Sequence, residues 1–185
     1  PLAFNPILVI KDNLEAFNKG LEIISYLPKE GIHVGITKDN DLDLYKSKNI
    51  YYHTFSGPHP IGLVGTQIHK ISPASLVNQI WTIGYQELIK IGKTVLTGYQ
   101  SNEKFISISG PQVFNPEILL TDFGACVEEL SAGKLVEGNN RLISGSVLCG
   151  HSCEGPLAYL SSFSNQLTVI REVNQDDREF LNWLR

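Results

Sequence analysis

The hydrophobic pattern of the first 55 residues predicts a strand, a helix and then two further strands. Residues 7–10 form a short apolar run typical of a buried strand. Asp12 and Glu15 have the spacing of a capping box, which predicts the start of a helix. Apolar residues then recur at spacings of three and four and give this helix one apolar face: Leu14, Phe17, Leu21 and Ile24. With apolar stretches at 32–36 and 50–55, this order predicts half of an α/β layered unit with a parallel sheet.

Residues 56–73 interrupt this pattern with three prolines and three glycines, in the order SGPHPIGLVGTQIHKISP. Glycine and proline at this density predict an irregular segment without a long helix or strand. Beyond it, residues 79–83 predict a strand. Residues 85–95 predict a helix that ends near Gly98.

From about residue 101 the pattern changes to short pieces that resemble strands. In order they predict a strand over 104–109, a short helix over 126–130, a turn at 138–140, and strands over 141–147 and 166–171. The last ten residues, Asp176 to Arg185, predict an exposed amphipathic turn or helix. A small α+β domain with a mixed sheet fits these pieces.

This change from longer elements to short strand-like pieces predicts a domain boundary near residue 100. The first domain then covers 1–100 and includes the connecting segment, and the small α+β domain covers 101–150. Residues 151–185 are expected to form a return segment with a terminal strand and helix.

Composition narrows the class of protein. Hydrophobic residues make up 42% of the 185 residues and charged residues 18%, which favours a globular chain over a disordered one. The net charge of −4 argues against non-specific binding to nucleic acid or to an anionic membrane. The apolar runs are far shorter than the roughly 18 residues of a membrane span. Three cysteines form no disulfide framework and favour a reducing compartment.

The chain contains no methionine and opens on Pro1, shortly before an apolar run. We therefore expect it to be a fragment of a longer protein.

The segment from Ser56 to His69 carries the most suggestive side chains. Its glycines would permit positive φ and close approach to a ligand: Gly57, Gly62 and Gly65. His59 and His69 could donate hydrogen bonds or relay protons near neutral pH. The alternative is a tight structural connection, with His69 as a structural residue. In either case we expect an ordered segment that lies between the two domains, because prolines reduce the entropy lost on ordering and Ile61 supplies an apolar anchor.

Other motifs are weaker. Cys149 and Cys153 flank His151 and suggest a metal site, but no second pair follows at a zinc spacing, so we expect no metal. No G-x-S-x-G elbow and no set of nucleophile, base and orienting group is present, which argues against a hydrolase. The dinucleotide fingerprint G-x-G-x-x-G is also absent.

Five motifs in order resemble the A-subunit family of the Na⁺-translocating NADH:quinone reductase. The resemblance covers essentially the whole chain, and several motifs in order are more specific than any single one. The motifs are Ser56–His69, Trp81–Gly92, Arg141–Leu148, Gly155–Leu160 and Asn165–Ile170.

The resemblance implies a peripheral subunit on the cytoplasmic face of the bacterial inner membrane, within a respiratory translocase. That complex passes electrons from NADH to ubiquinone and exports Na⁺. The implied fold is a partial Rossmann-like domain with a parallel sheet, truncated at its N-terminus. A small ubiquitin-like β-grasp domain, of the soluble-ligand-binding type, follows it. The implied partners are ubiquinone and the other subunits, with no nucleic acid and no membrane span in this chain.

The implied role is quinone binding and complex assembly, with no catalytic residue in the chain. Its quinone-binding candidates are His59, Gly62, Gly65 and His69. The Gly-rich flavin loop of the related complex I subunit has no counterpart here, so we expect the fragment to bind no cofactor and not to oxidise NADH. Cys149 and Cys153 depart from the family pattern and are expected to be incidental. The alternative is a stand-alone β-grasp module that binds a small ligand and has no redox role.

Overall fold

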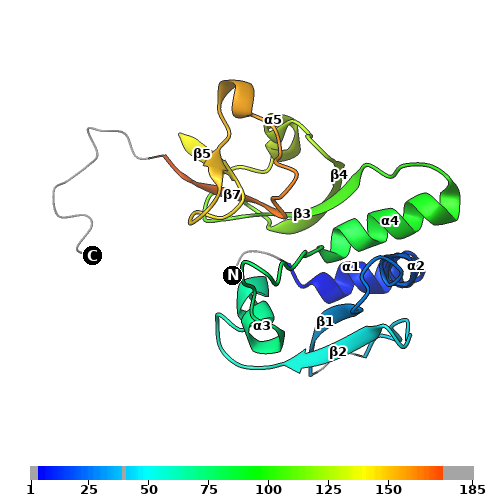
Figure 1. Cartoon of the computed structure of the whole chain (residues 1–185). Helices are drawn as coiled ribbons and strands as arrows, with labels where there is room; N and C mark the ends of the chain where they lie inside the picture. The colour runs from blue at the N-terminus through cyan, green and yellow to red at the C-terminus, as the bar shows by residue number, and fades with distance from the viewer. Residues whose placement is uncertain (1–3, 39–40, 173–185) are drawn as a thin grey trace. The chain divides into compact units, whose positions relative to one another are not determined.

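The computed structural model describes residues 4–38 and 41–172, and its contacts divide them into two compact units (Figure 1). The first unit is Pro6–Ser101, and the second is built from Asn102 onward. Each unit has its own sheet.

The first unit is an α/β unit with a parallel pair of strands. Its elements are α1 (Pro6–Asp12), α2 (Leu14–Ile24), β1 (Ile32–Thr37), β2 (Ile50–Phe55), α3 (Val64–Ile71) and α4 (Tyr85–Thr97). The strands β1 and β2 run parallel in a register that begins at Ile32 opposite Ile50 and ends at Thr37 opposite Phe55. The predicted helix over 14–24, the two strands and their parallel pairing are therefore confirmed.

Helices α2 and α4 cross at very short range through glycines. A Cβ placed on Gly92 of α4 would lie 1.7 Å from the carbonyl oxygen of Ala16 in α2. A Cβ on Gly20 of α2 would lie 2.2 Å from the carbonyl oxygen of Leu88 in α4. The missing side chains let the two backbones touch, so that Phe17, Leu21, Leu88 and Ile89 are buried.

The predicted strand over residues 7–10 is wrong, because these residues form helix α1 with Val9 and Ile10 buried. A four-residue apolar run does not distinguish a buried strand from a buried helix, and Pro6 suits the first helical position. The predicted capping box is wrong as well, since Asp12 is the last residue of α1. The N-cap of α2 is Asn13, whose Nδ2 donates 2.9 Å to the carbonyl oxygen of Val9.

Two further predictions in this unit are wrong and one is confirmed. Residues 64–71 of the Gly/Pro-rich segment form the eight-residue helix α3, because both early prolines precede it and none lies within it.

Residues 79–83 form no strand (Figure 1), since they pair with no strand among the described residues. Helix α4 ends as predicted at Gly98, which adopts the left-handed conformation at φ 77°.

The second unit is a β-grasp domain. Its elements are β3 (Glu103–Ser109), β4 (Glu117–Asp122), α5 (Val127–Ser131), β5 (Asn140–Ser144), β6 (His151–Ser152), the 3₁₀ turn η1 (Gly155–Leu157) and β7 (Gln166–Arg171). The sheet order is β4-β3-β7-β5-β6, with β3 and β7 parallel at the centre and the other pairs antiparallel. Counted from β3 as the first strand, this is the order 2-1-5-3-4 of a ubiquitin-like sheet. The predicted fold class is confirmed.

The core of this unit lies between the central strands and α5. Its apolar side chains are Ile106 and Ile108 of β3, Leu167 and Val169 of β7, and Val127 of α5, and in the two strands these apolar residues occupy alternate positions. The predicted strand over 141–147 is shorter, as β5 ends at Ser144. The predicted terminal turn or helix over 176–185 lies outside the described residues. Within the described ranges, no helix has the length and apolarity to cross a membrane.

Candidate functional site

The Gly/Pro-rich segment folds into two turns that lead into α3. The amide of Ile61 donates 3.1 Å to the carbonyl oxygen of Pro58, and the amide of Leu63 donates 2.9 Å to that of Pro60. Gly57 takes φ 141°, which a side chain rarely permits. By its contacts the segment belongs to the first unit, and its place between the domains stays a prediction.

The structure does not bring the two predicted histidines together. His59 lies in the first turn and His69 near the end of α3, and both side chains are exposed. Neither side chain makes a hydrogen bond or an ion pair with another residue of the described ranges. Both imidazoles are therefore accessible to a molecule outside the chain.

Gly62 and Gly65 are not points of close approach within the first unit. Neither has a positive φ, and a Cβ on either would meet no atom within 4 Å. The expected close approach of these glycines to the second domain or to a ligand stays a prediction. They leave bare backbone at the start of α3, beside the exposed side chains of Leu63 and Val64.

Gln67 joins α3 to the preceding turns and lies next to β1. Its Nε2 donates 3.2 Å to the carbonyl oxygen of Ile61. A Cβ on Gly35 of β1 would lie only 2.4 Å from the Oε1 of Gln67, so the carboxamide occupies the space above this strand. The absence of a side chain at Gly35 leaves the space that this carboxamide occupies.

A histidine pair on the same face of the sheet was missed by the sequence analysis. The Nδ1 of His33 in β1 lies 2.8 Å from the Nε2 of His53 in β2, and the donor depends on the tautomer. The rings stack with centroids 5.0 Å apart, and Tyr51 stacks on His33 at 5.2 Å. Phe55 lies beyond His53 at 6.5 Å. The sequence pattern that could have predicted this cluster is the spacing of two residues between Tyr51, His53 and Phe55. In a strand, this spacing places all three rings on one face of the sheet.

Desolvation of the His33 ring, followed by the proximity of His53, lowers the pKa of His33 below its ordinary value of 6.5. The folded chain then binds fewer protons than the unfolded chain near this pH. The resulting stability is present above pH 6.5 and is lost as the pH falls through the lowered pKa.

We therefore expect the midpoint of urea unfolding of the first unit to fall between about pH 7 and pH 5, where histidine titrates. The variant His33→Gln should show a shallower fall over the same range, because it removes the group whose pKa is lowered. The matched control is His69→Gln, whose ring has no partner in the described ranges. Equal pH profiles for His33→Gln and the unmodified chain would contradict this expectation.

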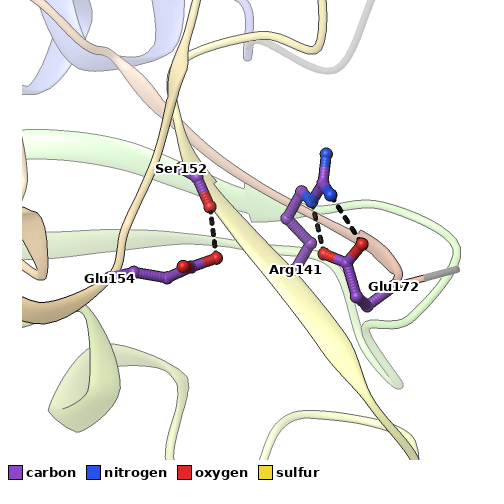
Figure 2. A network of polar contacts seen from close by, with 4 residues as sticks. All are labelled: Arg141, Ser152, Glu154 and Glu172. Carbon is purple, nitrogen blue, oxygen red and sulfur yellow. Dashed lines mark hydrogen bonds and ion pairs between the residues drawn. The ribbon is translucent and has the colours of Figure 1, made fainter. Parts of the chain in front are cut away.

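In the second unit, polar side chains of the motif that begins at Arg141 have structural roles. The Arg141 guanidinium forms a two-pronged ion pair with Glu172, in which Nη2 lies 2.5 Å from Oε1, and Glu154 accepts a hydrogen bond from Ser152 nearby (Figure 2). Hydrogen bonding to Glu172 raises the pKa of Arg141 above its ordinary value. The hydroxyl of the buried Ser144 accepts 3.0 Å from the amide of Ser161.

The cysteines of this unit show no ligand arrangement. Cys149 is exposed, whereas Cys153 is buried, and burial raises the pKa of its thiol. Across residues 4–38 and 41–172, no three His, Cys, Asp or Glu side chains are grouped so that they could hold a metal ion.

Comparison with known proteins finds matches for both units in one family. A family model described as the NqrA second alpha/beta domain matches residues 1–100, and one described as the NQRA C-terminal domain matches residues 105–155. Proteins named as the A-subunit of Na⁺-translocating NADH-quinone reductase match all of this chain. Those of Alcanivorax borkumensis and Neisseria meningitidis are 42% identical over 184 residues, and that of Serratia proteamaculans is 41% identical. The chain spans 41% of the length of the Alcanivorax protein and 40% of the length of the Serratia protein.

Proposed function

Because the chain belongs to the NqrA family of the Na⁺-translocating NADH-quinone reductase, we propose that it acts as part of such a subunit. The complex transfers electrons from NADH to ubiquinone and couples this transfer to Na⁺ export. The chain lies at the cytoplasmic face of the bacterial inner membrane, as a peripheral part bound to the other subunits. Its own role is in quinone binding and in complex assembly.

The observation that carries this proposal is the order of the two family matches. They follow one another along the chain, and relatives at 40–42% identity align with all of it. A stand-alone β-grasp module would require only the second unit. Since the chain spans about 41% of the length of these relatives, the activity of the whole subunit is inferred from the family.

The quinone role is assigned to the exposed surface formed by the two turns and α3. His59 and His69 offer imidazole donors to solvent, and a quinone carbonyl accepts such hydrogen bonds. Gly62 and Gly65 leave space next to the backbone, where a flat ring can approach. Exposed Leu63 and Val64 beside them provide apolar contact for a ring or an isoprenoid tail.

We also propose that this chain holds no flavin, nicotinamide or metal, and that no residue in it exchanges electrons directly. The absence of the phosphate-binding glycine fingerprint supports this part of the proposal. Ubiquinone is then a substrate that the chain helps to bind, and electron transfer occurs on cofactors held elsewhere in the complex.

The test is the variant His59→Ala in the subunit that carries this chain, assembled in the complex. Loss of one hydrogen bond to a quinone carbonyl should raise the KM for ubiquinone about fivefold. The rate with an artificial electron acceptor should not change, because that reaction bypasses the quinone site. The matched control is His151→Ala, which removes an exposed histidine from the second unit.

An unchanged KM for ubiquinone in His59→Ala, His69→Ala and the double variant would contradict the quinone role of this surface. Failure of the double variant to assemble with the other subunits would instead assign the surface to assembly, and gel filtration of the purified complex distinguishes the two results.

A further inference from the structure

The second unit has two neighbouring turns, each with a large apolar side chain at its tip. Leu148 lies in the turn between β5 and β6 and is 92% exposed. Phe163 lies in the turn before β7 and is 97% exposed. One exposed apolar side chain is ordinary at a protein surface, whereas two on adjoining turns form a patch of the kind that marks an interaction site. We call Leu148 and Phe163 the tip pair.

Both turns are fixed by hydrogen bonds within the chain. The amide of Gly150 donates 2.7 Å to the carbonyl oxygen of Ser146, whose hydroxyl accepts 3.3 Å from the amide of Leu148. In the other turn, the amide of Ser164 donates 3.1 Å to the carbonyl oxygen of Ser161. The backbone at each tip is therefore ordered before a partner binds, which lowers the conformational entropy that is lost on binding.

The two turns lie at the same end of the sheet and contact each other. The antiparallel strands β5 and β7 place the end of β5 beside the start of β7, with Ser144 opposite Leu167. The amide of Ser161 donates 3.0 Å to the hydroxyl of Ser144. A Cβ on Gly145 would lie 3.4 Å from the hydroxyl oxygen of Ser164. The two tips therefore belong to one surface of the second unit.

The segments that form this surface carry no charge. Residues 142–150 and 155–170 contain no Asp, Glu, Lys, Arg or His, and Val147 next to the first tip is also exposed. An anionic lipid surface attracts lysine and arginine, which these segments lack. The central part of a protein–protein interface, by contrast, is depleted in charge and enriched in aromatic side chains. The composition therefore favours a protein partner over a membrane.

The size of the tip pair argues against a second copy of this chain as the partner. Two side chains of this kind bury a few hundred Å² at most, whereas a stable interface buries about 800 Å² on each partner. The tip pair is therefore too small to hold two copies together. It fits an anchor within a larger contact, in which a few apolar side chains fill pockets on the partner and contribute most of the binding energy.

We propose that Leu148 and Phe163 anchor the second unit to another subunit of the translocating complex. The side chains insert into two apolar pockets on that subunit, and its surface around these pockets is uncharged. This inference rests on the proposed function, in which the chain is part of a subunit bound to others, and it identifies a surface of contact. It does not involve the quinone role of the first unit.

The test is the double variant Leu148→Ser with Phe163→Ser in the subunit that carries this chain. Loss of two anchors should raise the concentration at which this subunit dissociates from the purified complex at least tenfold, measured by gel filtration on dilution. The same double variant of the 185-residue chain should keep its urea midpoint, because both side chains are already exposed there. An unchanged midpoint separates a lost contact from a misfolded unit.

The matched control is Phe114→Ser, which removes another exposed aromatic ring from the second unit. Phe114 follows the last residue of β3, whereas the turn at Phe163 contacts Lys104 near the first, through the carbonyl oxygen of Ser162. The control therefore changes the opposite end of β3 and should leave the dissociation unchanged. A photo-crosslinking residue in place of Phe163 gives a second readout and should form a cross-link to another subunit in the purified complex.

The outcomes distinguish this inference from the proposed function. Failure of the unmodified subunit to assemble with the others would contradict the proposed function itself. Normal assembly of the double variant, or no cross-link from position 163, would overturn the anchor and leave the proposed function in place. Binding of the 185-residue chain to vesicles of phosphatidylethanolamine and phosphatidylglycerol, lost in the double variant, would assign the tip pair to a membrane. Self-association lost in the double variant would assign it to a second copy.

Discussion

Replacing Gly92 by valine is expected to unfold the first unit or to destabilise it by about 3 kcal/mol or more. A Cβ at this position would lie 1.7 Å from the carbonyl oxygen and 2.6 Å from the carbonyl carbon of Ala16. Both atoms belong to the backbone of α2, so a rotamer change cannot relieve the clash. Helices α2 and α4 would have to separate, and the buried side chains between them would lose their contacts.

Urea unfolding followed by circular dichroism measures this effect. The smaller change Gly92→Ala should also destabilise the unit. In an unhindered helix the same change would stabilise by about 1 kcal/mol, because alanine has the higher helix propensity. The matched control is Gly65→Ala in the first turn of α3, where a Cβ would meet no atom within 4 Å. This control should be as stable as the unmodified chain or up to about 1 kcal/mol more stable. A normal urea midpoint for Gly92→Val would refute the close crossing of the two helices.

Replacing Lys104 by alanine is expected to destabilise the second unit by about 2–4 kcal/mol. The Lys104 side chain is 1% exposed, and it is the largest fully buried side chain of the chain's described residues. Its Nζ donates a hydrogen bond to the carbonyl oxygen of Ser162 and lies 4.9 Å from the ring centroid of Phe123. The ammonium therefore holds the turn before β7 against β3. Truncation leaves both a cavity and a carbonyl without this donor.

Two further variants separate these contributions. Lys104→Met keeps most of the volume and removes the ammonium, so it should cost about 1–3 kcal/mol, less than alanine. Lys134→Met is the surface control. Its Nζ forms a 2.5 Å ion pair with Glu117 at the surface, and such pairs contribute about 0–1 kcal/mol. Equal urea midpoints for Lys104→Ala and Lys134→Met would contradict a structural role for Lys104.

The sequence predicted the regular elements best where the hydrophobic period was long enough to identify one structure. The four apolar positions of α2 recur with the period of a helix, and the apolar core residues of β3 and β7 alternate along each strand, so only one period places each set together. The apolar run at residues 7–10 is too short for this and forms a helix. Residues 79–83 have the composition of a strand, but a strand exists only when it pairs with a neighbour, and this segment pairs with no strand among the described residues.

The candidate site also has features that the sequence could predict and features that it could not. The density of glycine and proline identified residues 56–69 as an unusual segment, and the structure finds its histidines exposed. The pairing of His33 with His53 could not be predicted, because it depends on the register of two strands whose histidines are 20 residues apart. The contact of the Gln67 carboxamide with Gly35 likewise depends on how two separate segments fold together.

The sequence by itself therefore determined the two kinds of unit and the family, because local periodicity and ordered motifs do not depend on distant contacts. The tertiary structure alone decided which backbones touch at Gly20 and Gly92 and why a lysine is buried at position 104. It also decided that residues 79–83 remain an unpaired segment within the described ranges. The physical reason is that close packing, burial of a charge and strand pairing are properties of two segments together, and neither segment encodes its partner.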